Sequence, residues 1–218
     1  MSPFWQYALT VGPLGVYLWV VAFWQGGRHP RVVRGPVDSG MLAFGVGGVL
    51  AFGPVGQAIA RFLSPDPGLP QWAFLVSGLA LWGCLIAWRA GRRLVVYHVD
   101  ADRLISALAD VLSRTGGRYV KTMAGFEDVR VARGVRVEAT RRLRCAVVEA
   151  HGVDAARLIR EIGPALEQRL RAETTRRSPI ALSLYGVSVL VLVAPLVGLY
   201  LRRPRNRAVL RPERIKGA

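Results

Sequence analysis

The residues best suited to chemistry are histidines and aspartates at two helix starts. His98, Asp100 and Asp102 form an H-x-D-x-D run where a β-prone segment gives way to a helical pattern, and His151 and Asp154 stand at a second junction of this kind. Imidazole and carboxylate groups suit a divalent cation, so convergence of the two junctions would create a metal site. The competing interpretation makes Asp100 and Asp154 helix N-caps with half-exposed histidines beside them, and the pattern favours it.

The two junctions belong to a short internal repeat. V-D-A-D-R-L-I at 99–105 matches V-D-A-A-R-L-I at 153–159, and each follows a Val-Val pair in a strand-like run. In this alignment His98 falls opposite Gly152 rather than His151, which weakens the idea of a symmetric metal site. We therefore predict neither a resident metal nor a cofactor. The candidate ligands that stay open are His98, Asp100, Asp102 and His151.

No catalytic pattern is recognisable in the chain. The sequence has no nucleophile elbow, no zinc-ligand pair at useful spacing and no Cys–His motif. Cys145 lies within a strand-like run and fits a small core residue better than a nucleophile. The glycines of residues 41–63 are not followed by G-K-S or G-K-T, so they do not form a phosphate loop. The sequence predicts a protein that is not an enzyme.

Four long apolar segments must position these groups. Hydrophobic residues make up 52% of the 218 residues, the mean hydropathy is +0.30, and the apolar residues are concentrated in blocks. About 20 apolar residues in a helix span a hydrocarbon core of about 30 Å. The first block lacks the positive n-region and cleavage site of a signal peptide, which predicts an uncleaved anchor. The expected spans are residues 4–24, 41–63, 72–88 and 180–201.

Between the third and fourth spans the periodicity becomes that of a small α+β domain. We expect helices after Asp100 and Asp154, and strands at 94–97, 118–123, 128–139 and 143–150. This βα–ββ–βα order predicts a two-layer domain in which one sheet buries its inner face under both helices. The fold class is therefore membrane α-helical, with four transmembrane helices and the domain inserted between helices 3 and 4. The predicted regions are 1–93 (three helices), 94–177 (domain), 178–201 (fourth helix) and 202–218 (basic tail).

The formal charge of +16 lies mainly beside the apolar spans. Residues 94–175 carry 14 Lys/Arg and 11 Asp/Glu, which leaves 16 basic and three acidic residues for the rest of the chain. Arginine in such flanks normally meets lipid headgroups, so the charge favours a bilayer with anionic headgroups as partner and argues against nucleic acid. The expected interface anchors are Arg28, Arg31, Arg34, Arg89, Arg92, Arg93, Arg176, Arg177, Arg202 and Arg203.

Arginine also decides the predicted orientation. The segments that flank the spans on the domain side carry eight basic residues, and those on the other side of the membrane also carry eight. Seven of the latter eight lie in the tail, and they argue for placing the tail, rather than the domain, in the cytoplasm. Three arginines follow the first span, whereas residues 1–7 hold no charged side chain, and early helices usually dominate. Lysine is scarce among the basic residues, which suggests a GC-rich bacterial genome. We therefore predict a bacterial inner membrane with the domain in the cytoplasm, where Cys145 should resist a membrane-impermeant thiol reagent.

Small residues in the second span suggest contact with other helices. Ala43, Gly47 and Ala51 recur every four positions, which allows another helix to approach closely. We expect Gly47→Leu to weaken association more than Gly45→Leu, because Gly45 lies on a different face of the helix.

By elimination, the sequence favours a non-enzymatic accessory subunit or adaptor of a membrane protein complex, with the soluble domain docking a partner. Other membrane subunits are the expected partners, and a homo-oligomer stays open. The alternative is a membrane protein that binds a small molecule or metal ion, with a site at the histidine end of the domain or beside Gln57. Arg61, the other polar group of the second span, lies near its end and is expected to snorkel to the interface.

Overall fold

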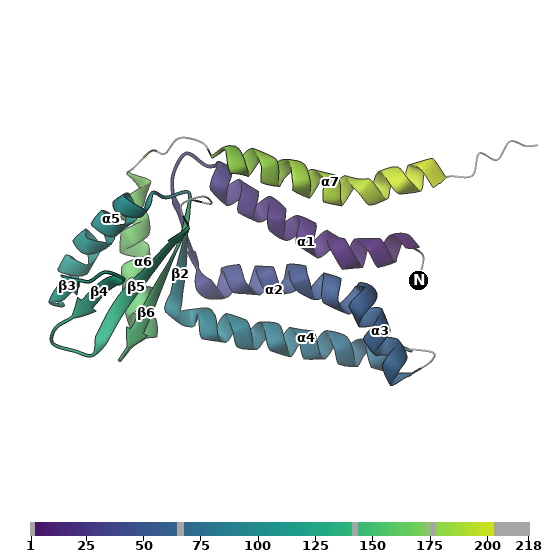
Figure 1. Cartoon of the computed structure of the whole chain (residues 1–218), viewed down its shortest axis with the longest axis horizontal. Coiled ribbons are helices and arrows are strands. Elements are labelled where there is room, and N and C mark those ends of the chain that lie inside the picture. The colour runs from purple at the N-terminus through teal and green to yellow at the C-terminus, as the bar shows by residue number, and fades with distance from the viewer. Residues whose placement is uncertain (1–2, 65–67, 141–143, 173, 175–177, 203–218) are drawn as a thin grey trace, which may run out of the picture.

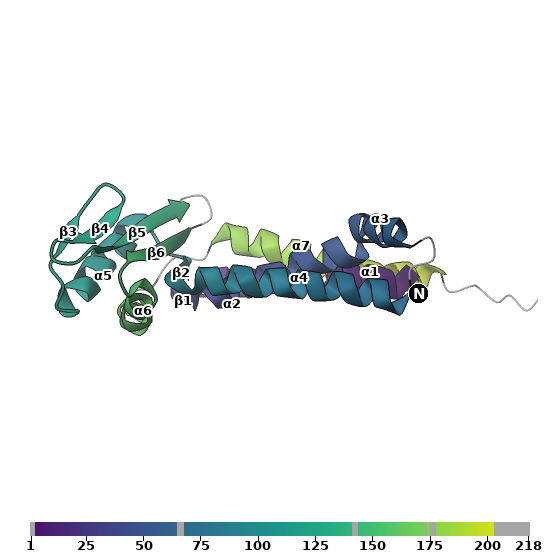
Figure 2. The ribbon, with the colours of Figure 1, turned by 90° about the horizontal axis from the view of Figure 1, so that it is seen from below.

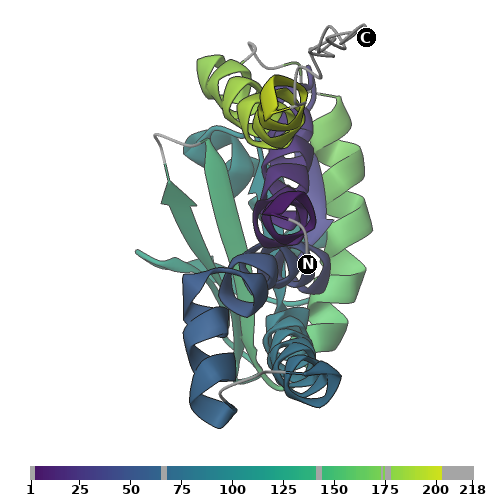
Figure 3. The same cartoon turned by 90° about the vertical axis from the view of Figure 1, so that its right-hand side faces the viewer.

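Four long helices lie side by side in the computed structural model, and a six-stranded sheet stands across one end of them (Figure 1). The structure describes residues 3–64, 68–140, 144–172, 174 and 178–202. The long helices pack in the order α7–α1–α2–α4, as a single row when seen along their axes (Figure 3). Their bounds are α1 (Pro3–Gly26), α2 (Gly35–Phe52), α4 (Leu69–Arg89) and α7 (Pro179–Arg202).

Each of these four helices is long and apolar enough to cross a membrane, which confirms the predicted number of apolar spans. A single row has no enclosed centre, so both of its faces carry exposed apolar side chains. Large examples are Trp19, Phe44, Phe74, Leu81 and Leu190. A water-soluble protein rarely exposes apolar surface of this extent.

The second predicted span is two helices and not one. After α2 the chain bends at Gly53, and α3 (Pro54–Leu63) turns away from the row (Figure 2). The proline that begins α3 has no N–H to continue the ladder of α2. A Cβ atom at Gly56 would overlap the carbonyl of Ala51, so the corner requires glycine there. Gln57 Nε2 donates a hydrogen bond of 3.2 Å to the carbonyl of Phe52, one of the last acceptors of α2.

The sheet is antiparallel throughout, in the order β1-β2-β6-β5-β4-β3. β1 and β2 lie beside the long helices, and β3 lies at the edge farthest from them (Figures 1 and 2). The strand bounds are β1 (Arg31–Arg34), β2 (Arg93–Tyr97), β3 (Tyr119–Lys121), β4 (Gly125–Asp128), β5 (Arg133–Thr140) and β6 (Cys145–Gly152).

Two strands differ from the sequence prediction. The expected strand 128–139 is interrupted, because the carboxylate of Asp128 accepts the backbone N–H of Arg130 at 3.0 Å and closes a local turn. β4 and β5 flank this turn, so three strands and not two separate the two βα units. In addition, β1 comes from the loop between the first two apolar helices, which the sequence analysis assigned to the membrane region.

Helices α5 (Ala101–Arg114) and α6 (Ala155–Arg171) cover one face of the sheet, as the periodicity predicted. Their apolar sides meet the inward residues of the strands in one buried core. Its largest fully buried members are Leu94, Val96, Leu104, Leu108, Leu112, Val135, Val148, Ile162, Leu166 and Leu170. The helical layer therefore leaves the other face of the sheet for the long helices and for solvent.

Candidate functional site

The two candidate metal-binding junctions lie apart, because the strands that carry them are antiparallel neighbours. Tyr97, at the end of β2, pairs with Cys145, at the start of β6, and His98 follows Tyr97 directly. His151 pairs with Gly134, six residues further along β6. At about 3.4 Å per residue this separates the two junctions by about 20 Å. The structure therefore does not bring His98 and His151 together.

The remaining candidate ligands sit at helix starts. Asp100 and Asp154 occupy the N-cap positions of α5 and α6, as predicted, although neither side chain makes a capping hydrogen bond within the described residues. Asp102 lies in the first turn of α5. His98 is 1% exposed, which corrects the expectation of a half-exposed side chain, whereas His151 is exposed. The described residues contain no group of three or more His, Cys, Asp or Glu that could hold a metal ion.

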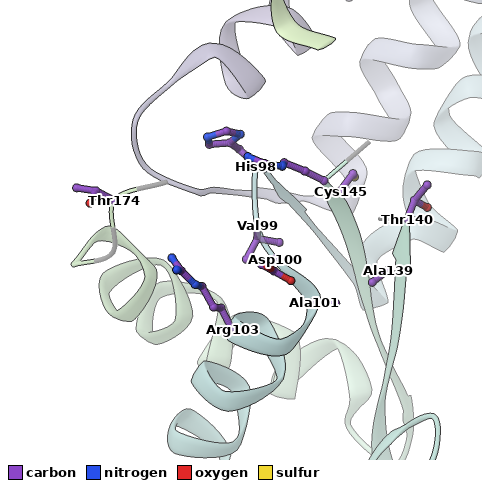
Figure 4. Close-up of a pocket in the computed structure, with 10 residues that line it drawn as sticks. His98, Val99, Asp100, Ala101, Arg103, Ala139, Thr140, Cys145 and Thr174 are labelled. Atoms are coloured by element: carbon purple, nitrogen blue, oxygen red, sulfur yellow. The ribbon is translucent and has the colours of Figure 1, made fainter. Parts of the chain in front are cut away.

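His98 instead lines a cavity of about 390 Å³, here called the His98 cavity (Figure 4). The cavity lies between the start of α5 and the adjoining ends of β5 and β6. Arg103 and Arg144 supply positive charge to its wall, and Asp100 supplies a carboxylate. Ala101, the first residue of α5, also lines it, and the N-terminal amides of a helix attract anions. This combination suits a ligand with a negatively charged group.

Cys145 lines the same cavity but is a poor nucleophile. Burial, and then the negative charge of Asp38, raise the pKa of the Cys145 thiol to about 11. Little thiolate forms at neutral pH, and the thiolate is the reactive species. Cys145 would therefore resist a thiol reagent on either side of a membrane, which makes it an unsuitable probe of orientation. A cysteine in place of the fully exposed Met123 is the better probe.

A second buried cluster joins the sheet to the long helices on the face opposite α5 and α6. This junction cluster contains Val21 of α1 with Val95 and Tyr97 of β2. The Tyr97 hydroxyl donates a hydrogen bond of 2.5 Å to Asp38 Oδ1, in the first turn of α2. The Tyr97 ring centroid lies 5.3 Å from that of Trp24. Burial, followed by the hydrogen bond to Asp38 and its charge, raises the pKa of Tyr97 well above its ordinary value.

Sequence reasoning missed this cluster. The available signal was Asp38 itself, since residues 1–93 contain only one other acidic residue, Asp66. An acidic residue at the start of an apolar helix needs a partner, and the partner is more than 50 residues away in the sequence.

The strands β1 and β2 are continuous with the long helices α2 and α4. β1 ends at Arg34 and α2 begins at Gly35, while only the 3₁₀ turn Ala90–Arg92 separates α4 from β2. The two connections cross in close contact, because a Cβ atom at Gly35 would overlap the carbonyl of Ala90 and lie 2.8 Å from the carbonyl oxygen of Arg93. The domain is therefore fixed to the helix row by two short connections.

Glycines also allow α1 and α2 to pack closely. A Cβ atom at Gly45 would lie 3.2 Å from Cβ of Tyr17, and one at Gly48 would lie 2.8 Å from the carbonyl oxygen of Leu9. Both glycines therefore face α1, and larger side chains there would separate the helices.

The predicted packing residues divide between two faces. Ala43 lies against α4, where its Cβ is 3.4 Å from the position of a Cβ at Gly83, and Ala51 is buried. No described atom comes within 4 Å of a Cβ built at Gly47. Within the chain, the expected order of the Gly47→Leu and Gly45→Leu variants is therefore wrong, because Gly45 is the residue in contact. A role for Gly47 toward a partner stays a prediction.

The predicted interface arginines that the structure describes gather where the long helices meet the sheet. Arg28, Arg31 and Arg34 lie between α1 and α2, and all are exposed. The guanidinium of Arg31 stacks 4.9 Å from the ring centroid of Phe23. Arg89 ends α4, Arg92 ends the 3₁₀ turn and Arg93 begins β2. Arg93 Nε pairs with Glu149 at 2.9 Å. Arg176, Arg177, Arg203 and the tail lie outside the described residues, as does the side chain of Arg202. Arg61 is exposed at the opposite end of the row, on α3.

The far edge of the sheet, β3 with its flanking residues, offers unpaired backbone. Among the described strands β3 pairs with β4 alone. The carbonyl of Arg118 accepts the N–H of Val129, and the N–H of Thr122 donates to the carbonyl of Gly125. Backbone groups alternate in direction along a strand, so the N–H and C=O groups of Tyr119 and Lys121 face away from the sheet.

The exposed side chains around this far edge are mainly apolar and basic, although β4 also exposes Glu127 beside Val120. Val120 is 52% exposed and Val129 67% exposed, and Met123 and Val131 are exposed as well. Three exposed cations accompany them: Arg118, Lys121 and Arg130. The far edge therefore combines free hydrogen-bonding groups, apolar contact surface and positive charge.

The described part of the chain thus contains two candidate sites, the His98 cavity and the far edge at β3. No protein-family model, curated protein or solved structure matches this chain.

Proposed function

We propose that the chain is a multi-pass protein of the bacterial cytoplasmic membrane, with α1, α2, α4 and α7 as its transmembrane helices. The apolar surface on both faces of the helix row supports this placement, since lipid would cover it. The exposed arginines at the sheet end would lie at headgroup depth, with the domain on the cytoplasmic side. At the opposite end, α3 exposes Val55, Ile59 and Phe62 on one side, a pattern typical of a helix lying in the interface.

Its function is that of a non-enzymatic adaptor, or accessory subunit of a membrane complex, which docks a partner protein through the far edge of the sheet. The observation that carries this proposal is the outward direction of the N–H and C=O groups of Tyr119 and Lys121. An extended segment of a partner can add a strand there and use these groups for affinity. The surrounding Arg118, Lys121 and Arg130 favour an acidic segment, because complementary charge speeds association and selects partners.

Short edge strands that carry lysine are also a means of preventing unwanted strand pairing. The test must therefore separate docking from protection. Lys121→Pro removes an N–H that faces outward and leaves the bonds between β3 and β4 in place, since proline is tolerated where its nitrogen faces away from the sheet. Lys121→Thr removes the same charge but keeps the N–H, so it is the matched control.

We expect Lys121→Pro to lose most of the protein that co-purifies with the detergent-solubilised wild type, by about tenfold, as expected when backbone hydrogen bonds to a partner are left unmade. Lys121→Thr should retain most of it. Both variants should keep the wild-type melting temperature. A stoichiometric partner that stays bound to Lys121→Pro would contradict docking at this edge.

The second candidate function is binding of a small molecule or ion, and the arginine-lined His98 cavity favours it. The alternative location beside Gln57 has lost support, because the Gln57 amide donates to the carbonyl of Phe52 at the corner between α2 and α3. A ligand of the His98 cavity would raise the melting temperature of the purified protein, and above Kd the rise would grow with the logarithm of the ligand concentration.

A further inference from the structure

Arg144 stands between two cavities of different character. It lines the polar His98 cavity and also a second cavity of about 640 Å³, here called the α7 cavity. The α7 cavity is formed at the end of α1 and the start of α7, and its other lining residues are Gly26, Ser178, Pro179, Ala181, Leu182 and Tyr185. Arg144 itself has a positive φ of 46°, a conformation uncommon for a residue with a side chain. The turn before β6 therefore holds this arginine where the domain meets the helix row.

Hydrogen-bond donors lie on both sides of Arg144. On the domain side they are Arg103 and the first amides of α5. On the helix side, Ser178 is 5% exposed, and its Oγ has no hydrogen-bond partner among the described residues. Ser178 directly precedes α7, which begins with Pro179 and therefore has no N–H at its first residue, and the N–H of Ala181 donates to the carbonyl of Ser178 at 3.2 Å. A buried hydroxyl without a partner is costly, so a ligand oxygen at this position would be stabilising.

The rest of the α7 cavity is apolar. Ala181, Leu182 and Tyr185 continue along α7 toward the part of the helix that the proposed function places in the bilayer. Leu182 is 78% exposed, so an apolar ligand would cover surface that the chain itself leaves open. The two cavities together thus present a cationic site at headgroup depth and an apolar surface that leads from it into the hydrocarbon.

We infer that this pair of cavities binds one membrane phospholipid, with its phosphate group at Arg144 and an acyl chain along Leu182 and Tyr185. Guanidinium groups bind phosphate oxygens through short, charge-assisted hydrogen bonds, and Arg103 and Ser178 Oγ supply further donors. Asp100, in the wall of the His98 cavity, provides an acceptor for an amine or hydroxyl of the headgroup. The inference rests on the proposed membrane location, and it adds a specific lipid site to it.

The test is native mass spectrometry of the full chain, released from detergent after purification from membranes, with Arg144→Gln and Arg160→Gln compared. Each variant removes one arginine charge, but Arg160 is exposed on α6 and lines neither cavity. We expect the wild type and Arg160→Gln to retain one phospholipid, and Arg144→Gln to retain about tenfold less, because a charge-assisted contact is lost. Ser178→Ala, a smaller change, should reduce retention in the same direction.

Added inorganic phosphate separates a lipid from a free anion. Retention that survives excess phosphate supports a phospholipid, whereas displacement of the bound mass by phosphate alone would overturn the inference. Equal retention by Arg144→Gln and Arg160→Gln at equal melting temperature would overturn it as well. Washing the membranes with carbonate tests the membrane location independently. If the chain stays in the washed membranes but retains no lipid, only the lipid site is contradicted. If the wash extracts the chain, the proposed function is contradicted.

Discussion

The two edges of the sheet differ in almost every respect. At the near edge, β1 is the outermost strand, and its neighbour β2 is buried on both faces, with Leu94 and Val96 under the helical layer and Val95 and Tyr97 against α1. At the far edge, β3 has three residues, one neighbouring strand and an exposed Val120. One sheet thus has a fixed end and a free end. This difference indicates that the strands near the long helices hold the domain in place, whereas the far edge is available for binding.

The largest effect is expected at the crossing of the two connections between sheet and helices. Gly35→Ala places a methyl group against the carbonyl of Ala90, so the crossing must open, at an expected cost of about 2–4 kcal/mol in the free energy of unfolding. Gly40→Ala, in the same helix, has no atom within 4 Å of its new methyl group and serves as the control. Thermal unfolding in one detergent measures both. Equal midpoints would mean that the near edge is not held at Gly35.

A smaller loss is expected from Tyr97→Phe, which removes the hydrogen bond to Asp38. A hydrogen bond to a charged group contributes about 1.5–3 kcal/mol. Because the pKa of Tyr97 is raised in the fold, this stability is fully present below the unfolded pKa of about 10 and is lost as the pH rises above it. Tyr97→Phe should therefore show a flatter decline in unfolding free energy between neutral and strongly alkaline pH.

The pH comparison is best made in a Cys145→Ala background. The Cys145 pKa is also raised, to about 11, so its thiol adds an alkaline loss of the same sign in both proteins. An identical alkaline decline with and without the Tyr97 hydroxyl would show that the hydrogen bond to Asp38 does not anchor the near edge.

The smallest effect is expected at the far edge, where one substitution can be compared at both ends of the sheet. Val129→Thr places a hydroxyl at an exposed position and should change the free energy of unfolding by less than about 0.5 kcal/mol. Val95→Thr makes the same change at a buried position and should cost about 1–3 kcal/mol. Chemical denaturation in detergent compares the two. A large loss from Val129→Thr would mean that the far edge is part of the core.

Sequence periodicity predicted the parts of the fold that depend on local pattern. Four apolar blocks gave the four long helices, and the spacing of Leu104, Leu108 and Val111 placed the buried side of α5. The prediction was wrong where a single side chain redirects the backbone. Asp128 closes a turn inside an apparently continuous strand, and the Gly53–Pro54 step separates α3 from α2. The Gly53–Pro54 break can be recognised in the sequence of residues 41–63, whereas the turn at Asp128 does not change the hydrophobic pattern enough to be recognised in advance.

The candidate sites depended on pairings that the sequence does not encode locally. The repeat at 99–105 and 153–159 suggested two equivalent junctions, but equivalence in sequence says nothing about strand direction. β2 and β6 pair antiparallel, so His98 and His151 lie at opposite ends. The His98 cavity likewise depends on Arg144 meeting the start of α5 and the region of Thr174, three segments far apart in the chain.

The direction of the strands sets how the domain would respond to mechanical force. The strands run across the axes of the long helices, so the hydrogen bonds between them point along the line from the helix row to the far edge (Figure 1). Under the proposed docking at the far edge, a partner that pulls away from the membrane would stretch these bonds directly. The three residue pairs between β3 and β4 would yield first, whereas the near edge is also held by the crossing at Gly35. Overload would thus detach the outermost strand and spare the connection to the helices.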